Sequence, residues 1–186
     1  MKFLYPSASI LFLLLFSSCI ANPTATASPT IGDGAIRFDL VLPTNEFHSF
    51  DEVNFQVVLT NQSDKSILVH SRLHYVSMYV PASISEMLIL IFDSSGNRIV
   101  RQCDLNYAGP SIDTLEELQP GKQITQTLYL RDSCFFDDSL FTTGEKYAIV
   151  ATYQNELDVT QTIDGVDVSS WVGSVQSNEV TFTIKP

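Results

Sequence analysis

The stretch 53-VNFQVVLT-60 decides the fold, because apolar side chains occupy every second position along it. A period of two places these side chains, from Val53 to Leu59, on one face of an extended chain. The stretch 35-AIRFDLVL-42 alternates in the same way from Ile36 onward. Both stretches are therefore predicted to be half-buried β-strands.

Further short strands are predicted along the rest of the chain. Met87–Phe92 is apolar at every position, which indicates a strand covered on both faces. The other predicted strands alternate or are bounded by turn residues, and they are Ile67–Arg72, Arg98–Gln102, Gln123–Leu130, Tyr147–Tyr153 and Asn178–Ile184.

Several segments are less regular. Residues 73–86 fit either a strand or a loop, and the acidic stretch 155–170 is expected to contain a hairpin. Within the connection 104–118, Leu115–Leu118 is interpreted as one helical turn. Since residues 34–186 show no long apolar repeat of 3.6 residues, they are predicted to form a single all-β domain. Its expected architecture is an antiparallel β-sandwich of seven to nine strands.

Two motifs refine this prediction. Gly144–Tyr147, at the start of a strand, resembles the tyrosine corner of immunoglobulin-like sandwiches, in which the hydroxyl binds nearby backbone. Trp171–Gly173 followed by Ser177–Phe182 is similar to the closing strand of immunoglobulin-like modules on bacterial surfaces. The resemblance implies an immunoglobulin-like sandwich, although this tryptophan is near the last strand, unlike in antibody domains.

An export signal is indicated at the N-terminus. Lys2 precedes the apolar run Ile10–Phe16, which is too short to span a membrane as a helix. Ser17-Ser18-Cys19 follows and resembles the end of a bacterial lipoprotein signal, in which the cysteine becomes the lipidated first residue.

This resemblance implies a signal peptide over residues 1–18, lipid on Cys19 and a flexible tether over residues 19–33. The domain would then be anchored to the cell membrane on its extracytoplasmic side. The alternative is ordinary cleavage after Ala21 or Ala27, which gives a free secreted protein.

The acidic composition limits the partners. Without residues 1–18 the chain carries 9 basic and 21 acidic residues, a formal charge of −12. Nucleic acids and anionic lipid surfaces are bound through basic side chains, so neither is expected as a partner. Solubility on an exposed surface explains the charge.

Three cysteines are present. If Cys19 carries lipid, Cys103 and Cys134 remain, and an oxidising compartment favours a disulfide between them. That bridge would stabilise the fold by about 3–4 kcal/mol on the chain-entropy model. The alternative is two separate reduced thiols.

No catalytic or cofactor-binding motif is found. His70 and His74 are four residues apart, and the only other histidine is His48, so no zinc site is predicted. The aspartates at 137–138 and 158–167 match no calcium-loop signature and are interpreted as solvated loops. Nor does a Ser or Cys stand in a nucleophile motif, so the protein is not expected to be an enzyme.

The layout from Val53 to Tyr153 also resembles the bacterial intracellular proteinase inhibitor family. The matching segments are turns, namely Thr60–Lys65, Asp93–Asn97 and Leu118–Gly121. The resemblance implies a sandwich scaffold, and no inhibitory residue maps onto this chain.

Two functions are therefore expected. The first is a non-catalytic module that contacts an envelope or extracellular protein, or a ligand, without a cofactor. Leu73–Pro81 is one candidate contact surface. The alternative is an inhibitor of extracytoplasmic serine proteases acting through a protruding loop, either Asp104–Leu118 or Phe135–Thr143.

Overall fold

The computed structural model describes residues 34–76, 85–99, 109–132, 136 and 138–186. In these residues the regular structure consists of strands and of four 3₁₀ turns, each three residues long. The prediction of an all-β fold is confirmed. No helix in this part of the chain is long and apolar enough to cross a membrane.

The first sheet contains the two strands that were clearest in the sequence. β1 (Ile36–Val41) pairs with β3 (Asn54–Asn61), and β3 pairs on its other edge with β9 (Gln123–Tyr129). Both pairings are antiparallel. The alternation of β1 between buried and less buried positions matches the predicted period of two.

The second sheet is larger and is built around β10 (Lys146–Asn155), whose odd-numbered residues are buried. Its order is β2 (Glu46–Phe47), β14 (Val180–Ile184), β10, β6 (Met87–Phe92) and β5 (Tyr75–Val76). In addition, β13 (Gly173–Gln176) pairs with β10 and β7 (Arg98–Ile99) pairs with β6.

The described residues contain fourteen strands, more than the seven to nine expected. Three of them, β2, β5 and β7, are fragments of two residues. Most pairings are antiparallel, as predicted. The exceptions are short, since β2 runs parallel to β14 and β5 runs parallel to β6.

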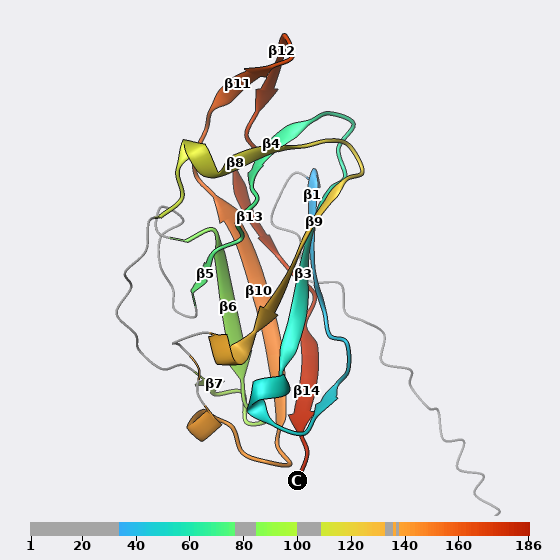
Figure 1. The fold of residues 1–186 in the computed structure, drawn as a ribbon, viewed down its shortest axis with the longest axis vertical. Helices are drawn as coiled ribbons and strands as arrows, with labels where there is room; N and C mark the ends of the chain where they lie inside the picture. Colours follow the sequence, from blue (N-terminus) through green and yellow to red (C-terminus); the bar gives the residue numbers. More distant parts are fainter. Residues whose placement is uncertain (1–33, 77–84, 100–108, 133–135, 137) are drawn as a thin grey trace, which may run out of the picture.

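The two sheets pack against each other through one apolar core (Figure 1). Phe38 of β1 contacts Tyr153 of β10, with their ring centroids 6.1 Å apart. Polar contacts also join the sheets, because the Asn178 side chain accepts from the Leu40 N–H at 2.8 Å and donates to its carbonyl at 3.0 Å. The arrangement is that of a β-sandwich.

Tyr147 makes the contacts expected of the tyrosine corner. Its hydroxyl accepts from the backbone N–H of Thr142 at 2.5 Å and donates to the carbonyl of the same residue at 3.3 Å. The ring is buried against Phe141 and Phe182. The turn before β10 is therefore fixed from inside the core.

Two further pairs of strands lie at one end of the sandwich. β4 (Ile67–His70) pairs with β8 (Leu115–Leu118), and β11 (Thr160–Ile163) pairs with β12 (Val166–Ser169). The expected hairpin in residues 155–170 is thus confirmed. It extends beyond the sandwich at the end opposite the C-terminus (Figure 1).

The prediction that Leu115–Leu118 forms a helical turn is wrong. Two leucines three residues apart would share one face of a helix, whereas in the strand β8 they lie on opposite faces. Leu115 packs with Leu68 and Val168 in a small separate cluster, whereas Leu118 belongs to the main core. Pairing with β4 satisfies the backbone of this segment as a strand.

Candidate functional site

The three cysteines assigned from the sequence lie outside the described residues. Lipid on Cys19 and a disulfide between Cys103 and Cys134 therefore stay predictions. The same holds for most of the predicted contact surface at Leu73–Pro81, of which residues 73–76 are described. Of the two candidate inhibitory loops, Asp104–Leu118 ends in the paired strand β8, so that part of it does not protrude as a loop.

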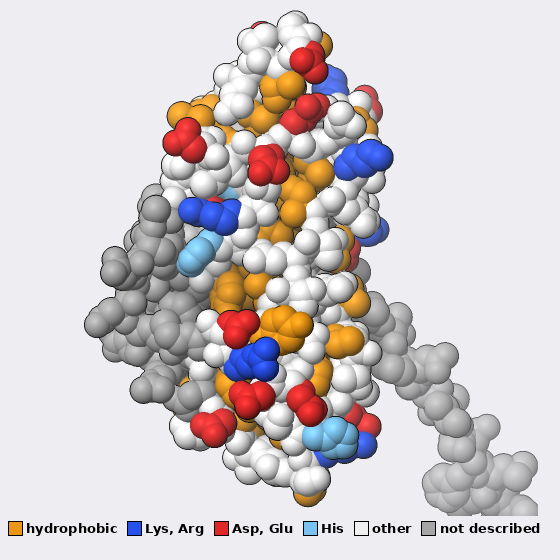
Figure 2. Space-filling view, in the orientation of Figure 1, with side chains coloured by type: hydrophobic (Ala, Val, Ile, Leu, Met, Phe, Trp, Pro, Cys, Tyr) orange, Lys and Arg blue, Asp and Glu red, His pale blue; other side chains and the backbone are white. Residues whose placement is uncertain are grey.

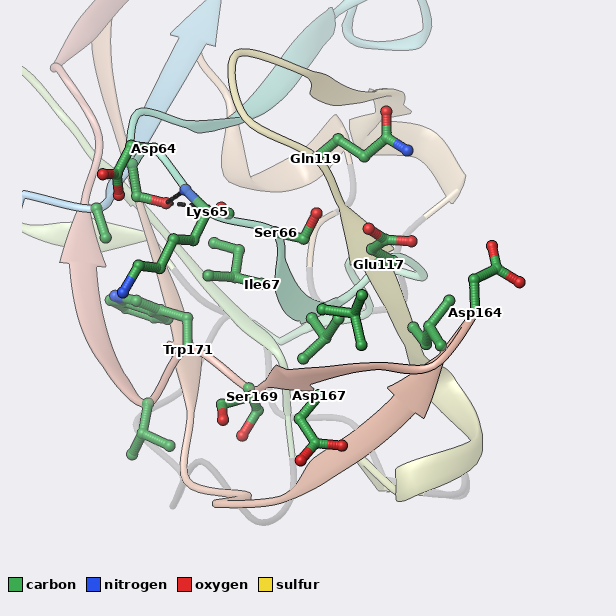
Figure 3. A pocket seen from close by; sticks show the side chains of 17 residues that line it. Asp64, Lys65, Ser66, Ile67, Glu117, Gln119, Asp164, Asp167, Ser169 and Trp171 are labelled. Carbon is green, nitrogen blue, oxygen red and sulfur yellow. Dashed lines mark hydrogen bonds between the residues drawn. The ribbon is translucent and has the colours of Figure 1, made fainter.

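A groove of about 840 Å³ opens at the end of the sandwich that carries the hairpin (Figure 3). One side is formed by the hairpin and by residues 170–172. The other side is formed by residues 63–67, by Glu117 in β8 and by Gln119 just after β8. Ala35, which directly precedes β1, also lines it. Segments far apart in the sequence thus share one open surface.

The hairpin wall of the groove depends on a two-residue turn. Asp164 and Gly165 have φ values of +51° and +80°, and positive φ at both positions is typical of a tight hairpin turn that favours Asp-Gly. Ile163 pairs with Val166 across it. The small cluster of Leu68, Leu115 and Val168 then attaches the hairpin to β4 and β8.

Trp171 forms part of the groove and is held in place by contacts with the core and with β4. Its ring stacks on Tyr153 with a centroid distance of 5.7 Å, and its backbone N–H donates to Leu68 at 3.0 Å. Gly173 has a φ of +149°, and a Cβ there would lie 3.1 Å from the indole. Glycine at 173 therefore allows both the backbone conformation and the close approach of the ring.

The groove has an apolar part and an acidic part. Val166 and Val172 are 64% and 48% exposed, which places apolar surface at its sides. Four carboxylates also line it, from Asp64, Glu117, Asp164 and Asp167, against one lysine, Lys65. Figure 2 shows hydrophobic, acidic and basic side chains close together at the hairpin end of the face in view.

Behind the groove, His70 belongs to a buried polar network. Its Nδ1 is 2.7 Å from the Thr114 hydroxyl and its Nε2 is 3.1 Å from Oδ1 of Asn155. The Asn155 amide is oriented by Leu157 N–H, which donates to Oδ1, and by Trp171 O, which accepts from Nδ2. In the neutral imidazole, Nε2 therefore carries the hydrogen and donates to Oδ1 of Asn155. The Thr114 hydroxyl itself donates to the Ser111 carbonyl at 2.8 Å.

Glu86 is the buried charge of this network. Its side chain is 0% exposed and forms an ion pair with Arg72, with Arg72 Nη2 2.6 Å from Oε1. The other carboxylate oxygen accepts from the backbone N–H of His74 at 3.0 Å. Both oxygens are thus bound, which is what a buried carboxylate requires.

The histidines and aspartates considered in the sequence lie in several different places in the structure. Of the two histidines that are four residues apart in the sequence, His70 is fully buried and His74 is partly exposed. In the described part of the chain, no three His, Cys, Asp or Glu side chains are arranged to hold a metal ion. Asp164 and Asp167 line the groove, Asp138 is exposed elsewhere, and Asp137 lies outside the described residues.

The environments of His70 and His74 predict that the folded protein loses stability as the pH falls. Burial lowers the pKa of His70 and His74 below 6.5, and Arg72 lowers both further, whereas the Glu86 carboxylate opposes the shift. As the pH falls, the unfolded chain therefore takes up protons before the folded one does. We expect full stability above about pH 6.5 and a loss as the pH falls through the folded-state pKa values.

This expectation is checked by urea denaturation at several pH values between about 7.5 and 5.5, above the range in which most carboxylates titrate. The urea concentration at the midpoint of unfolding should fall as the pH is lowered. The control His48→Gln, at an exposed position, should show the same fall with pH. The variant His70→Asn should show a smaller fall. A constant midpoint across this range for the unaltered chain would contradict the prediction.

Comparison with known proteins adds no relative. No protein-family model matches this chain, and no curated protein matches it in sequence.

Proposed function

We propose that this protein is an extracytoplasmic lipoprotein, anchored in the membrane through Cys19, which acts without catalysis by binding another protein. The observation that carries the proposal is the groove of about 840 Å³ between the hairpin β11–β12 and the loop at residues 63–67. An open groove with both apolar and charged walls is suited to contact with a protein surface.

The other parts of the proposal rest on the chain's sequence and core. Lys2, the apolar run Ile10–Phe16 and Cys19 support the anchor and the extracytoplasmic location. The tyrosine-corner contacts of Tyr147 support an immunoglobulin-like type of sandwich. Such sandwiches serve many functions, so the binding role is argued from the groove and not from the fold.

The anchor is tested by expressing the full chain and the variant Cys19→Ala in a bacterial host. The unaltered protein should partition into detergent and its mature mass should include lipid, whereas the variant should do neither. A control variant, Cys103→Ala, should keep the lipid. The proposed anchor is wrong if Cys19→Ala leaves the mass and the membrane fraction unchanged.

The binding role is tested separately, by cross-linking intact cells and purifying the lipoprotein from detergent-solubilised membranes. A protein should be recovered in a fixed ratio with it. Recovery of the lipoprotein without any cross-linked protein would contradict the proposal.

The second candidate is an inhibitor of extracytoplasmic serine proteases. The projecting hairpin β11–β12 with its two-residue turn favours it, because a fixed protruding segment can enter a protease cleft (Figure 1). An inhibitor should abolish the activity of a subtilisin-type protease at a one-to-one ratio. Under the binding proposal, such an assay should show no loss of activity.

A further inference from the structure

We infer that the groove binds an extended protein segment that carries lysine or arginine side chains alternating with apolar ones. The inference rests on the proposed binding function and adds the class of partner. Three features of the groove carry it: its negative charge, its exposed apolar walls and the outward-facing backbone of β12 at Asp167.

The charge comes first. Asp64, Asp164 and Asp167 are exposed and Glu117 is half-buried, and all four carboxylates line the groove. Among the described residues, no lysine or arginine forms an ion pair with any of them. Carboxylates on both walls give the groove a negative potential, which is complementary to a cationic segment.

Lys65 shows how a cation fits into this surface. In Figure 3 its side chain extends along the groove toward the indole of Trp171. A lysine side chain there can place its apolar stem along the groove wall and its ammonium group toward an aromatic ring. A basic side chain of a partner could extend along the same surface, with the groove's carboxylates as its counter-charges.

The groove also has apolar walls, so a partner that carried only charges would leave apolar surface uncovered. Two apolar side chains of the groove are well exposed: Val166 on the hairpin is 64% exposed and Val172 is 48% exposed. Ile67 and Ile163 are half-buried beside them. Covering these side chains requires apolar groups on the partner between its charges.

The backbone of β12 favours an extended conformation in the partner. Because Ile163 and Val166 close the two-residue turn, they exchange the first pair of hydrogen bonds, and Thr162 and Asp167 form the next, non-hydrogen-bonded pair. The N–H and C=O of Asp167 therefore point away from β11. The same edge is bridged to β4 further along, between Ser170 and Leu68, so an added strand would pair with β12 at Asp167, before that bridge. An added strand would bind such an edge through its own backbone.

The probe for the test is a fluorescent seven-residue peptide in which lysine and valine alternate. It is titrated against the lipidated full chain in non-ionic detergent, and fluorescence polarisation reports binding. We expect saturable binding that weakens as salt is added. Peptides with glutamate in place of lysine, or with serine in place of valine, should bind less tightly.

Charge reversal on both walls identifies the site. The double variant Asp64→Lys with Asp167→Lys should weaken binding by about tenfold, since it replaces a carboxylate with an ammonium group on each wall of the groove. Asp51→Lys with Glu179→Lys is the matched control, because it changes the net charge equally at exposed positions outside the groove. The control should bind the peptide as the unaltered chain does.

A third variant keeps the test valid if the charge reversal unfolds the hairpin. Val166→Ser leaves the charge unchanged and should also weaken binding, by removing an exposed apolar contact. Equal loss in the groove variant and in the control, or no binding by the unaltered chain, overturns the inference. If a cross-linked partner is recovered equally with the groove variant, the binding function stands and its assignment to the groove is overturned.

Discussion

Replacing Arg72 with methionine is expected to lower the free energy of unfolding by about 3–5 kcal/mol. The reason is the Glu86 carboxylate, which is fully buried and loses its cationic partner in this variant. The backbone N–H of His74 remains as a donor to one oxygen, but a hydrogen bond from a neutral group does not replace the charge of Arg72.

The matched control is Arg37→Met, which removes the exposed ion pair between Arg37 and Asp39. Exposed pairs contribute about 0–1 kcal/mol, so this change should be small. The double variant Arg72→Met with Glu86→Leu removes the buried carboxylate together with its partly exposed partner and should recover much of the lost stability. Urea denaturation measures all of these; equal effects of Arg72→Met and Arg37→Met would contradict the role assigned to the buried pair.

Phe182→Ala is expected to have an effect of similar size, about 3–5 kcal/mol. The ring is 1% exposed and lies in an aromatic cluster, 5.9 Å from Phe47, 6.3 Å from Phe141 and 5.3 Å from Tyr147 between centroids. These neighbours come from β2, from the turn before β10 and from β10 itself. The cavity left by the ring would therefore weaken the contacts among three segments.

Two controls separate a cavity effect from a general effect of shortening a side chain. Phe182→Leu fills most of the space and should lose much less stability than Phe182→Ala. Val41→Ala shortens an apolar side chain that is 45% exposed and should change stability by less than about 0.5 kcal/mol. A similar loss in Val41→Ala and Phe182→Ala would show that the aromatic cluster has no special role.

The strands could be predicted because their pattern is local. In β1 and β3 the apolar residues alternate, and in β6 they are continuous, so each segment's own sequence indicates which faces are covered. β8 was mispredicted because its two leucines are separated by three residues. Leu115 and Leu118 pack into different clusters because β8 pairs with β4, which lies 45 or more residues earlier in the chain. The local sequence pattern cannot indicate such a distant pairing.

The polar network and the groove could not be predicted for the same reason. Glu86 directly precedes the apolar run at Met87, which is an unusual place for a charge, but its burial depends on Arg72 fourteen residues before it. The groove combines residues 63–67, 117–119 and 163–172 with Ala35. No motif links these segments in the sequence, because the topology of the sandwich brings them to one end.

The position of Ala35 has a consequence for how a partner would be encountered. This residue lines the groove and directly precedes β1, so the chain enters the domain beside the groove. With Cys19 held in lipid, the length of chain over residues 19–33 allows that entrance to lie at most about 50 Å from the bilayer surface. Proteins in the same membrane would then meet the groove at a raised effective concentration. Under these conditions a weak and readily reversible interaction is sufficient, and molecules free in the surrounding medium are at a disadvantage.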